Sequence, residues 1–467
     1  LCVTRPAGQP PEIGSLTADV TLTHTQAGAR LGDAVANAGD LNGDGAVDLI
    51  VGAPGADVGA SVDYGVAYLY PGGNGGPATS PANALIAQAP SREFGINAAG
   101  IGDVNGDGIG DVGIAGMTSS VFSGSLHVWF GGRPFDGTRD QVIQNGAAFA
   151  RFGIGLANAG DVNGDGYSDV VVGAPTEETT FVEAGKAEVF YGGASGLNTT
   201  AGTTIIGPAL NSHLGEAVAG AGDVDADGYA DVLVGVPDQS TAGFARNGVV
   251  RLYRGAAAGL VTASPLLFEL ADDELRFGAA LALSDLNGDG FADPVFGAPG
   301  VAGGSAAQGA FAASFLVSEG RSSAVQQFRN PATPLDVQGD TESTDAFFVV
   351  MDGYSPHGRE RAKLGVEACP SGVAWGSSSC VRSTTASWID TTATAGGGLM
   401  VAHPDGLVEG ALYRWRARML YAPYAITTAS IVAPANPSAV GPWRRMRGSA
   451  DIADLRVLDT LFKNGFE

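Results

Sequence analysis

The chain is poor in basic residues and in long apolar runs. Its 467 residues include only 25 Lys and Arg against 49 Asp and Glu, which gives a net charge of −24. Nucleic acids and anionic membranes bind basic surfaces, so the composition argues against either one as the main partner. No apolar stretch approaches the roughly 18 residues that a membrane-spanning helix needs. We therefore expect no transmembrane segment.

Cysteine is also scarce, with three residues in the whole chain. Cys369 and Cys380 lie in a stretch rich in Gly and Ser, where we expect a disulfide; two buried free thiols are the alternative. Cys2 would then be free, lipid-modified or paired with another chain. The sequence begins at Leu1 without a methionine, as a processed product would.

The acidic residues are unevenly distributed along the chain. Residues 1–320 hold 35 acidic and 11 basic side chains, whereas residues 321–467 hold 14 of each. This difference predicts two differently built regions. The chain also contains 72 Gly and 24 Pro together with 45% hydrophobic residues. Many short apolar runs between turn residues favour an all-β protein.

A unit of about sixty residues occurs five times in the first region. Each unit opens with an aromatic residue or Leu followed by Gly, passes through an Asp-rich turn into a β-branched run, and reaches Ala-Pro or a variant of it. The first aspartates of the turns are Asp40, Asp103, Asp161, Asp223 and Asp285, at intervals of 63, 58, 62 and 62 residues. Regular spacing of this kind indicates a repeat architecture.

Four apolar runs per unit predict four strands. The fourth run lies at 84–87, 141–144, 203–206 and 266–269, and a corresponding run at 19–22 precedes the first unit. An N-terminal strand that completes the last unit closes a propeller ring and hides its edges. We therefore predict a five-bladed β-propeller of four-stranded blades, closed by residues near Val20–Leu22 pairing beside the strands of residues 279–317. A linear array is the alternative.

The turn of every unit reads Asp-x-[Asn/Asp]-x-Asp-Gly-x-x-Asp. Side-chain oxygens at positions 1, 3, 5 and 9, with a backbone carbonyl at position 7, form the ligand set that calcium prefers. The expected ligands are Asp40, Asn42, Asp44, Ala46 and Asp48; Asp103, Asn105, Asp107, Ile109 and Asp111; Asp161, Asn163, Asp165, Tyr167 and Asp169; Asp223, Asp225, Asp227, Tyr229 and Asp231; and Asp285, Asn287, Asp289, Phe291 and Asp293. No His or Cys occupies a ligand position, which disfavours zinc and copper.

An alternative for these turns is that Asn-Gly and Asp-Gly are simply good turn formers. That explains the glycine and one aspartate, but not the aspartates at positions 1, 5 and 9 of all five units. Crowded carboxylates repel one another when no cation lies between them. The sequence therefore predicts up to five Ca²⁺ ions, one per unit, with the fifth loop weakened by Pro294 next to Asp293.

The units resemble FG-GAP repeats, the blades of the integrin α-chain head and of many bacterial surface proteins. The FG half corresponds to Leu31-Gly32, Phe94-Gly95, Phe152-Gly153, Leu214-Gly215 and Phe277-Gly278, and the GAP half to Gly52-Ala53-Pro54, Gly173-Ala174-Pro175 and Gly297-Ala298-Pro299. Gly235-Val236-Pro237 is a variant, and Gly116-Met117-Thr118 departs from the motif. The integrin head has seven blades, whereas five are visible here; two degenerate blades beyond residue 320 are the alternative to a five-bladed ring.

The remaining third of the chain lacks both the repeat and the acidity. We expect a propeller at 1–320, a linker at 321–338, a small fibronectin type III-like β-sandwich at 339–450 and a tail at 451–467. In the sandwich Tyr413 would be the corner residue whose hydroxyl ties back to the backbone. An ordinary β-strand is the alternative for this segment.

The sequence shows no HExxH, GxSxG, P-loop or CxxC motif, and its five histidines are scattered. We therefore expect a secreted or cell-surface protein, not an enzyme, that binds calcium and recognises an unidentified protein or glycan ligand at the cell surface or matrix. One alternative is a calcium-stiffened structural spacer of an extracellular assembly. Another is a propeller-type enzyme that cleaves carbohydrates or esters, with acids drawn from different blades; the acids near blade ends outside the loops are Asp63, Glu93, Glu183 and Glu216.

Overall fold

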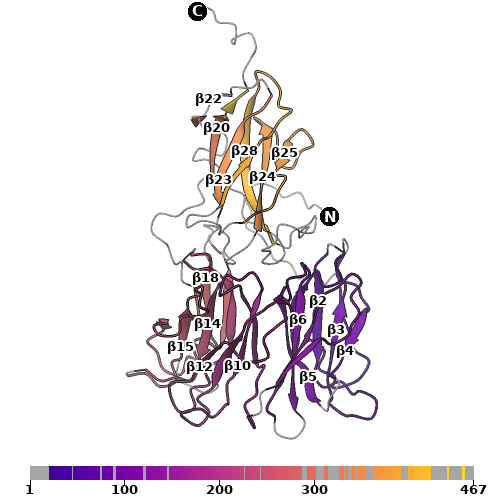
Figure 1. Ribbon diagram of the computed structural model, residues 1–467, viewed down its shortest axis with the longest axis vertical. Coiled ribbons are helices and arrows are strands. Elements are labelled where there is room, and N and C mark those ends of the chain that lie inside the picture. Colours follow the sequence, from indigo (N-terminus) through magenta and orange to yellow (C-terminus); the bar gives the residue numbers. More distant parts are fainter. Residues whose placement is uncertain are drawn as a thin grey trace, which may run out of the picture.

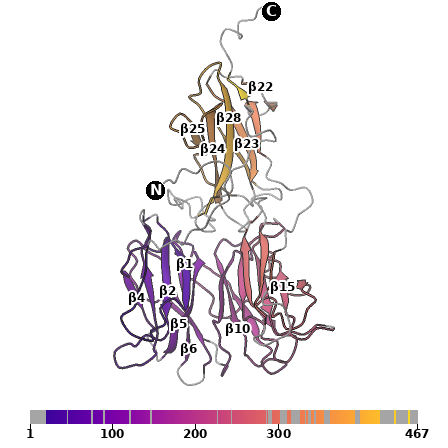
Figure 2. The same ribbon diagram turned by 180° about the vertical axis from the view of Figure 1, so that it is seen from behind.

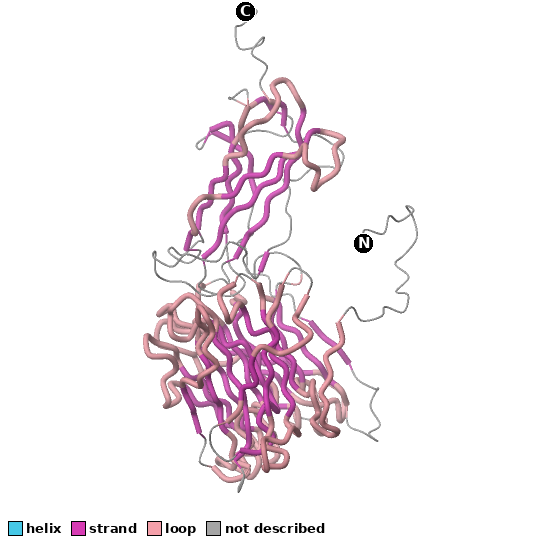
Figure 3. Tube along the Cα trace, turned by 90° about the vertical axis from the view of Figure 1, so that its right-hand side faces the viewer, coloured by secondary structure: helices cyan, strands magenta, loops and turns pink. Residues whose placement is uncertain are grey.

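The computed structural model describes residues 20–44, 46–73, 76–87, 91–118, 122–144, 147–225, 227–241, 243–284, 286, 292–300, 310–313, 325–330, 333–334, 339–341, 345–353, 361–390, 398–421, 439–440 and 455–457. Within these ranges every regular element is a β-strand, and Figure 3 shows strands and loops but no helix. The predicted all-β fold class is confirmed.

Each repeat folds as one antiparallel sheet whose strands pair in chain order. The first two sheets consist of β1 (Ala34–Gly39), β2 (Asp48–Ala53), β3 (Val66–Tyr70) and β4 (Asn83–Leu85), and of β5 (Ser91–Gly102), β6 (Asp111–Thr118), β7 (Ser125–Trp129) and β8 (Gln141–Gln144). The third consists of β9 (Gly155–Gly160), β10 (Asp169–Ala174), β11 (Lys186–Phe190) and β12 (Thr203–Ile206). The fourth consists of β13 (Val218–Gly222), β14 (Asp231–Val236), β15 (Val249–Tyr253) and β16 (Leu266–Glu269), and the fifth of β17 (Ala280–Ser284), β18 (Asp293–Ala298) and β19 (Ala310–Ala313). Four sheets have the four strands that the sequence predicts, and three strands of the fifth are described.

The sheets pack face to face, which explains their β-branched second strands. All six residues of β10 and of β14 are buried, so both faces of these strands are covered. Val171 and Val189 of the third sheet share one hydrophobic core with Val232 and Val234 of the fourth. Strands covered on both faces need continuous apolar runs instead of alternation, as the segments VVV and VLV provide.

The first strand of each sheet lies beside the first strand of the next. β1 contacts β5, β5 contacts β9, β9 contacts β13, and β13 contacts β17. In Figure 1 the first two sheets lie on one side of the lower body and the third to fifth on the other. The first strands therefore form the inner layer of a propeller.

Residues near the N-terminus lie against the first sheet. Val20 Cγ2 lies 3.9 Å from the position that an added Cβ would take at Gly76 of the first repeat. Gly196 occupies the equivalent position in the third repeat, and there the Gln141 side chain of the second repeat lies close to the added Cβ. Because Gln141 begins the fourth strand of the second sheet, Val20 occupies the place of a fourth strand beside the first sheet. Residues 20–23 form no strand, and the described residues show no pairing of this segment with β17–β19. Ring closure and the blade count of five therefore stay predictions.

A second body of two sheets lies above the propeller in the views of Figures 1 and 2. One sheet has the order β21 (Thr333–Pro334), β20 (Val325–Asn330), β23 (Phe348–Gly353) and β27 (Gly398–Ala402). The other has the order β22 (Gly339–Asp340), β30 (Leu455–Arg456), β28 (Leu412–Tyr421), β24 (Arg361–Pro370) and β25 (Val381–Thr384), with β26 (Ile389–Asp390) on β24 and β29 (Ala439–Val440) on β28. The prediction of a sandwich after the propeller agrees with this arrangement.

The two sheets of this body enclose one hydrophobic core. Val349 and Met351 of β23 pack with Leu364 of β24 and with Trp415 of β28, and all four are buried. The backbone N–H of Val408 donates to the Tyr413 hydroxyl at 3.1 Å, which is the backbone tie that the sequence predicts. The predicted disulfide between Cys369 and Cys380 is present in the structure. The likeness to fibronectin type III domains remains a proposal.

The structure corrects both ends of this domain. Val325–Asn330, which the sequence assigns to a linker, pairs with β23 as part of the sandwich. Leu455–Arg456, assigned to the tail, pairs with β28, and Leu455 and Val457 are fully buried. Both segments are short and contain few apolar residues, so their patterns are too weak to predict strands. The propeller boundary at residue 320 lies outside the described residues.

Candidate metal loops and polar hollow

The predicted ligand loops connect the first and second strands of their sheets. The first four loops are described except for Gly45 and Ala226. Of the fifth set, Asp285, Asn287, Asp289 and Phe291 lie outside the described residues, and only Asp293 is described. The aspartate at position 9 begins the second strand of each sheet, as in Asp169 of β10.

That last aspartate is buried in each described loop. Asp111, Asp169, Asp231 and Asp293 are 0% exposed. One carboxylate oxygen of Asp169 accepts from the N–H of Val162 in its own loop, and the other accepts from the N–H of Gly192, both at 2.9 Å. The same pair of bonds recurs on Asp48, Asp111 and Asp231. This aspartate therefore ties its loop to the turn between the third and fourth strands, a role that the sequence analysis did not assign.

The first aspartate accepts hydrogen bonds from backbone N–H groups of its own loop. Asp161 accepts from the N–H of Gly166 at 2.8 Å and from that of Asp165 at 3.1 Å. Asp103 makes the corresponding bonds with its own loop. Gly166 has a φ of 95°, which confirms that position 6 turns sharply and favours glycine.

The side chains at positions 3 and 5 also accept hydrogen bonds from the loop backbone. In the second loop the Asn105 side-chain oxygen accepts from the Asp107 N–H at 2.9 Å, and Asp107 accepts from the Ile109 N–H at 2.9 Å. In the fourth loop one carboxylate oxygen from each of Asp223, Asp225 and Asp227 lies within 4.8 Å of the others. The predicted contribution of the carbonyl at position 7 stays a prediction.

Burial without a compensating cation disfavours the charged form of these carboxylates. Burial raises the pKa of Asp103 to about 6, and the neighbouring charge of Asp107 acts in the same direction. Burial, with two like-charged neighbours in the same loop, also raises the pKa of Asp111, Asp169 and Asp231 well above the ordinary value. A divalent cation among these oxygens would remove this penalty.

The loops therefore fit a hard divalent cation. Every side-chain donor is a carboxylate or amide oxygen, and the glycine at position 6 lets the loop wrap. Two guanidinium groups lie at these loops: that of Arg254 is 3.3 Å from Asp225 at the exposed end of the fourth loop, and the Arg133 side chain packs on Gly43 of the first loop. Two guanidinium groups at two of the loops do not balance the buried carboxylates of all four.

Each metal loop also contacts the next sheet. The carbonyl oxygen of Asp103 accepts from the N–H of Ser168 at 2.9 Å, and that of Asp161 accepts from Ala230 at 3.0 Å. The tyrosine at position 7 of one loop packs on the glycine at position 4 of the previous loop, as Tyr167 does on Gly106. The conformation of one loop is therefore coupled to the conformation of the next loop.

At the other end of the sheets, the FG and GAP motifs meet. A Cβ at Gly173 of the third repeat would lie 1.9 Å from the carbonyl oxygen of Gly215, the FG glycine of the fourth repeat. Gly52 meets Gly95 and Gly235 meets Gly278 in the same way. The strand register places Ala115 at the corresponding position of the second repeat. The FG motif of one repeat therefore packs against the GAP motif of the repeat before it.

The residue before each FG motif has a left-handed backbone. The φ values are 58° for Arg30, 52° for Glu93, 55° for Arg151, 52° for His213 and 51° for Arg276. The last four donate their N–H to the carbonyl oxygens of Asp63, Phe122, Glu183 and Arg246 in the previous repeat. Left-handed residues other than glycine are strained, and the strain is held here by contacts between repeats. Four of the five carry a charge at neutral pH, and all lie at the same end of the propeller.

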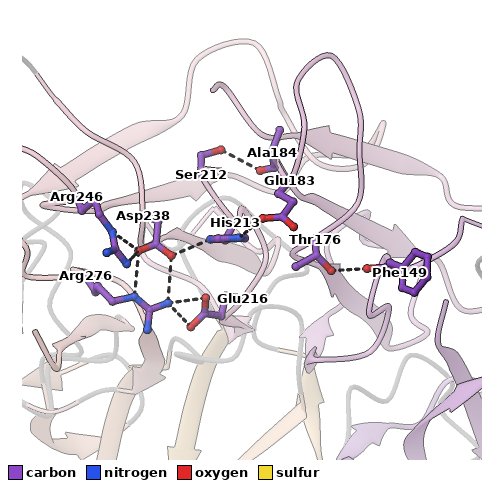
Figure 4. A network of polar contacts seen from close by, with 10 residues as sticks. All are labelled: Phe149, Thr176, Glu183, Ala184, Ser212, His213, Glu216, Asp238, Arg246 and Arg276. Carbon is purple, nitrogen blue, oxygen red and sulfur yellow. Dashed lines mark hydrogen bonds and ion pairs between the residues drawn. The ribbon is translucent and has the colours of Figure 1, made fainter. Parts of the chain in front are cut away.

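A polar network joins the third, fourth and fifth repeats at this end (Figure 4). Asp238 binds His213 at 2.8 Å, Arg246 at 2.6 Å and Arg276 at 3.2 Å. Arg276 also binds Glu216 at 2.7 Å, and His213 lies 3.4 Å from Glu183 of the third repeat. This network borders a hollow of about 340 Å³.

The network shifts the proton affinities of two of its members. The hydrogen bond to Asp238 raises the pKa of His213, against the effect of burial, and Glu183 and Glu216 act in the same direction. Burial raises the pKa of Asp238, but its bonds with His213, Arg246 and Arg276 outweigh that effect and hold the pKa well below its ordinary range. Asp238 therefore stays a carboxylate at neutral pH.

We expect His213→Gln to destabilise the propeller at low pH more than at high pH. A group whose pKa is raised by folding stabilises the fold below its unfolded pKa, here near 6.5, and loses that effect as pH rises through the folded pKa. The loss should be about 1–2 kcal/mol at about pH 5.5 and small at about pH 9, measured by calorimetry. His403→Gln, in the sandwich, is the control. An equal loss at both pH values would show that His213 does not act through its charge.

Comparison with known proteins agrees with the repeat geometry. Residues 152–187 and 214–253 match the FG-GAP repeat. Human integrin alpha-6 is 34% identical over 110 residues, which cover 24% of this chain and 9% of that protein. Phosphatidylinositol-glycan-specific phospholipase D of Bos taurus is 32% identical over 174 residues, which cover 35% of this chain and 20% of that protein.

A solved structure resembles the whole chain only distantly. Fructan 1-exohydrolase IIa from Cichorium intybus, in complex with 1-kestose, aligns over 95% of this chain and 99% of that chain with a TM-score of 0.31 and 8% identity. A score this low does not establish a shared fold. Among the described residues there is no helix that could span a membrane. The sequence matches and the stacked four-stranded sheets together support an FG-GAP propeller family for the repeat region.

Proposed function

We propose that this protein is a non-catalytic recognition module, secreted or held at the cell surface, whose propeller is stabilised by calcium. The observation that carries the proposal is the recurring loop in which buried aspartates converge beside the joint between neighbouring sheets. Calcium in each loop would neutralise the carboxylates and hold the backbone that contacts the next sheet. The opposite end, with its FG contacts and polar hollows, would then present a preformed surface to a ligand.

The chemistry of the hollow supports binding over catalysis. Its carboxylates, Glu216 and Asp238, both contact the Arg276 guanidinium. A hydrolytic acid pair needs one carboxyl group that can deliver a proton near neutral pH. Asp238 is held ionised and does not suit that role, and Glu216 is bound to the Arg276 guanidinium.

The relatives support the extracellular part of the proposal. Integrin alpha-6 and the phospholipase both contain a segment similar to this chain, yet the chain spans only 9% and 20% of their lengths. Their whole activities therefore do not carry over. Calcium sites of the extracellular kind bind in the range of about 10⁻⁴–10⁻³ M and would be filled outside cells.

An array experiment tests the recognition role. The labelled full chain is incubated with a glycan and extracellular-matrix array, once in millimolar calcium and once in chelator. We expect calcium-dependent capture by a defined ligand. Capture in neither buffer would contradict recognition and favour the structural spacer, for which the propeller only separates other components. Turnover of an arrayed glycan or ester would contradict the non-catalytic assignment.

A further inference from the structure

The hollow at the FG end is built from three consecutive repeats. Its walls include Arg151, Ile154 and Pro175 of the third repeat, His213 and Asp238 of the fourth, and Arg276 of the fifth. Its volume of about 340 Å³ is large enough for a small ligand or for two or three side chains of a larger one. The network in Figure 4 forms one wall of it.

The charges on that wall are already balanced. Asp238 contacts the two cationic side chains Arg246 and Arg276 and also binds His213, and Glu216 contacts Arg276. His213, Glu216 and Asp238 offer atoms close enough to hold a metal ion, but a cation there would have to displace the Arg276 guanidinium. The wall is therefore a poor cation site.

Arg151, in contrast, has an uncompensated charge. It is exposed and lines the hollow, and its side chain forms no hydrogen bond or ion pair with any described residue. This is unusual in a region where acidic residues outnumber basic ones by 35 to 11. A guanidinium presents a planar set of donors that matches a carboxylate.

The surface beside Arg151 is apolar. Ile154 and Pro175 line the hollow, and the hydroxyl of Thr176 in its wall donates to the carbonyl oxygen of Phe149. Phe149 is 62% exposed and has a φ of 60°. An exposed aromatic residue held in a strained backbone conformation is a feature of binding surfaces, where aromatic and Arg side chains contribute most of the affinity.

We propose that this hollow binds a carboxylate that is attached to an apolar group, with Arg151 pairing with the carboxylate and with Ile154 and Pro175, which line the hollow, contacting the apolar part. The inference deepens the recognition role proposed above, since it names the chemical class of the ligand. The carboxylate could belong to a small organic acid or to an acidic side chain flanked by apolar residues in a peptide.

A titration with defined probes tests this site in the full chain with calcium present. The probes are 3-phenylpropanoate, its uncharged amide, and the capped peptides Phe-Glu-Phe and Phe-Gln-Phe. The readout is the methyl NMR signal of Ile154, assigned by its loss in Ile154→Val. We expect a saturable shift with the carboxylate probes, weakened about 10-fold or more by Arg151→Gln. Arg92→Gln, which removes an exposed charge beside the neighbouring hollow, should leave the affinity unchanged.

Each outcome decides the proposal. Tighter binding of Phe-Glu-Phe than of phenylpropanoate would assign a peptide ligand, and the reverse order a small acid. An absent or unsaturable shift with both carboxylates would overturn the site. Equal binding of the uncharged probes, or equal weakening in Arg92→Gln, would overturn the role of Arg151. The titration requires no surface ligand, so its failure leaves the array result untouched and the two proposals fail separately.

Discussion

Removal of calcium is expected to lower the melting temperature of the propeller by on the order of 15 °C and to leave the C-terminal sandwich nearly unchanged. With dissociation constants of about 0.1 mM and about 2 mM free ion, each filled loop contributes about 1.8 kcal/mol, or roughly 9 kcal/mol for five loops. A chelator empties all the loops, and the backbone hydrogen bonds of Asp103 and Asp161 to the next loop place their contributions in one propeller transition.

The two bodies can be followed separately in one sample. Four of the five tryptophans lie beyond residue 320, so their fluorescence reports the sandwich, where Trp415 is fully buried. Calorimetry detects the larger propeller transition. Magnesium at the same concentration is the control, since it fits an all-protein oxygen cage poorly. Equal melting of the propeller in calcium and in chelator would contradict metal binding by these loops.

Gly173→Val is expected to destabilise the propeller by about 3 kcal/mol or more. The FG glycine of the next repeat presents its carbonyl oxygen 1.9 Å from the site of the new Cβ, so the sheets must separate. The second repeat tolerates Ala115 at the corresponding position, where the Cα lies 3.7 Å from the site of a Cβ at Gly153. At Gly215 the same distance to Gly173 is 3.1 Å. The two sheets must therefore lie farther apart to accommodate one methyl group at this position, as they do at Ala115. The two further carbons of valine require a larger separation.

Gly297→Val is the matched control for this substitution. Gly297 is the GAP glycine of the fifth repeat, and in the described part of the chain its closest neighbour is the Ala280 side chain at 3.0 Å, with no FG carbonyl opposite. We expect its cost, measured by calorimetry, to stay below about 1.5 kcal/mol. Similar costs for both variants would mean that FG–GAP contacts do not join the sheets, or that Gly297 has a partner of the same kind.

The repeat itself could be read from the sequence because its signals are local. The aspartates, glycines and β-branched runs recur at fixed offsets, and they predict the strands that the structure describes in the five repeats, whereas residues 20–22 of the expected N-terminal strand form none. The role of the loops as calcium ligands stays a prediction. The sequence does not reveal that Asp169 also binds Gly192, because that bond depends on how the turn after β11 folds back. Likewise, FG and GAP occur in every unit, but their contact lies between units.

The hollow was not predicted from the sequence, for a different reason. Arg151, His213 and Arg276 are about sixty residues apart, and each is an isolated charged or polar residue in its own segment. Their shared place before the FG motif was a usable signal, since it is occupied by a charged side chain or His in every unit. The strand Val325–Asn330 was missed because its central residues are glutamines and its pattern is that of a linker. Its pairing with β23 depends on tertiary packing.

The most direct test of the central claim is the number of calcium ions bound by the full chain, measured by native mass spectrometry and equilibrium dialysis. The five loops predict five ions, and Asp161→Asn, which keeps one side-chain oxygen for the loop backbone, should remove one of them while the other loops stay filled. A chain that binds no calcium at millimolar concentration, or a count that Asp161→Asn leaves unchanged, would contradict the assignment of these loops as calcium sites.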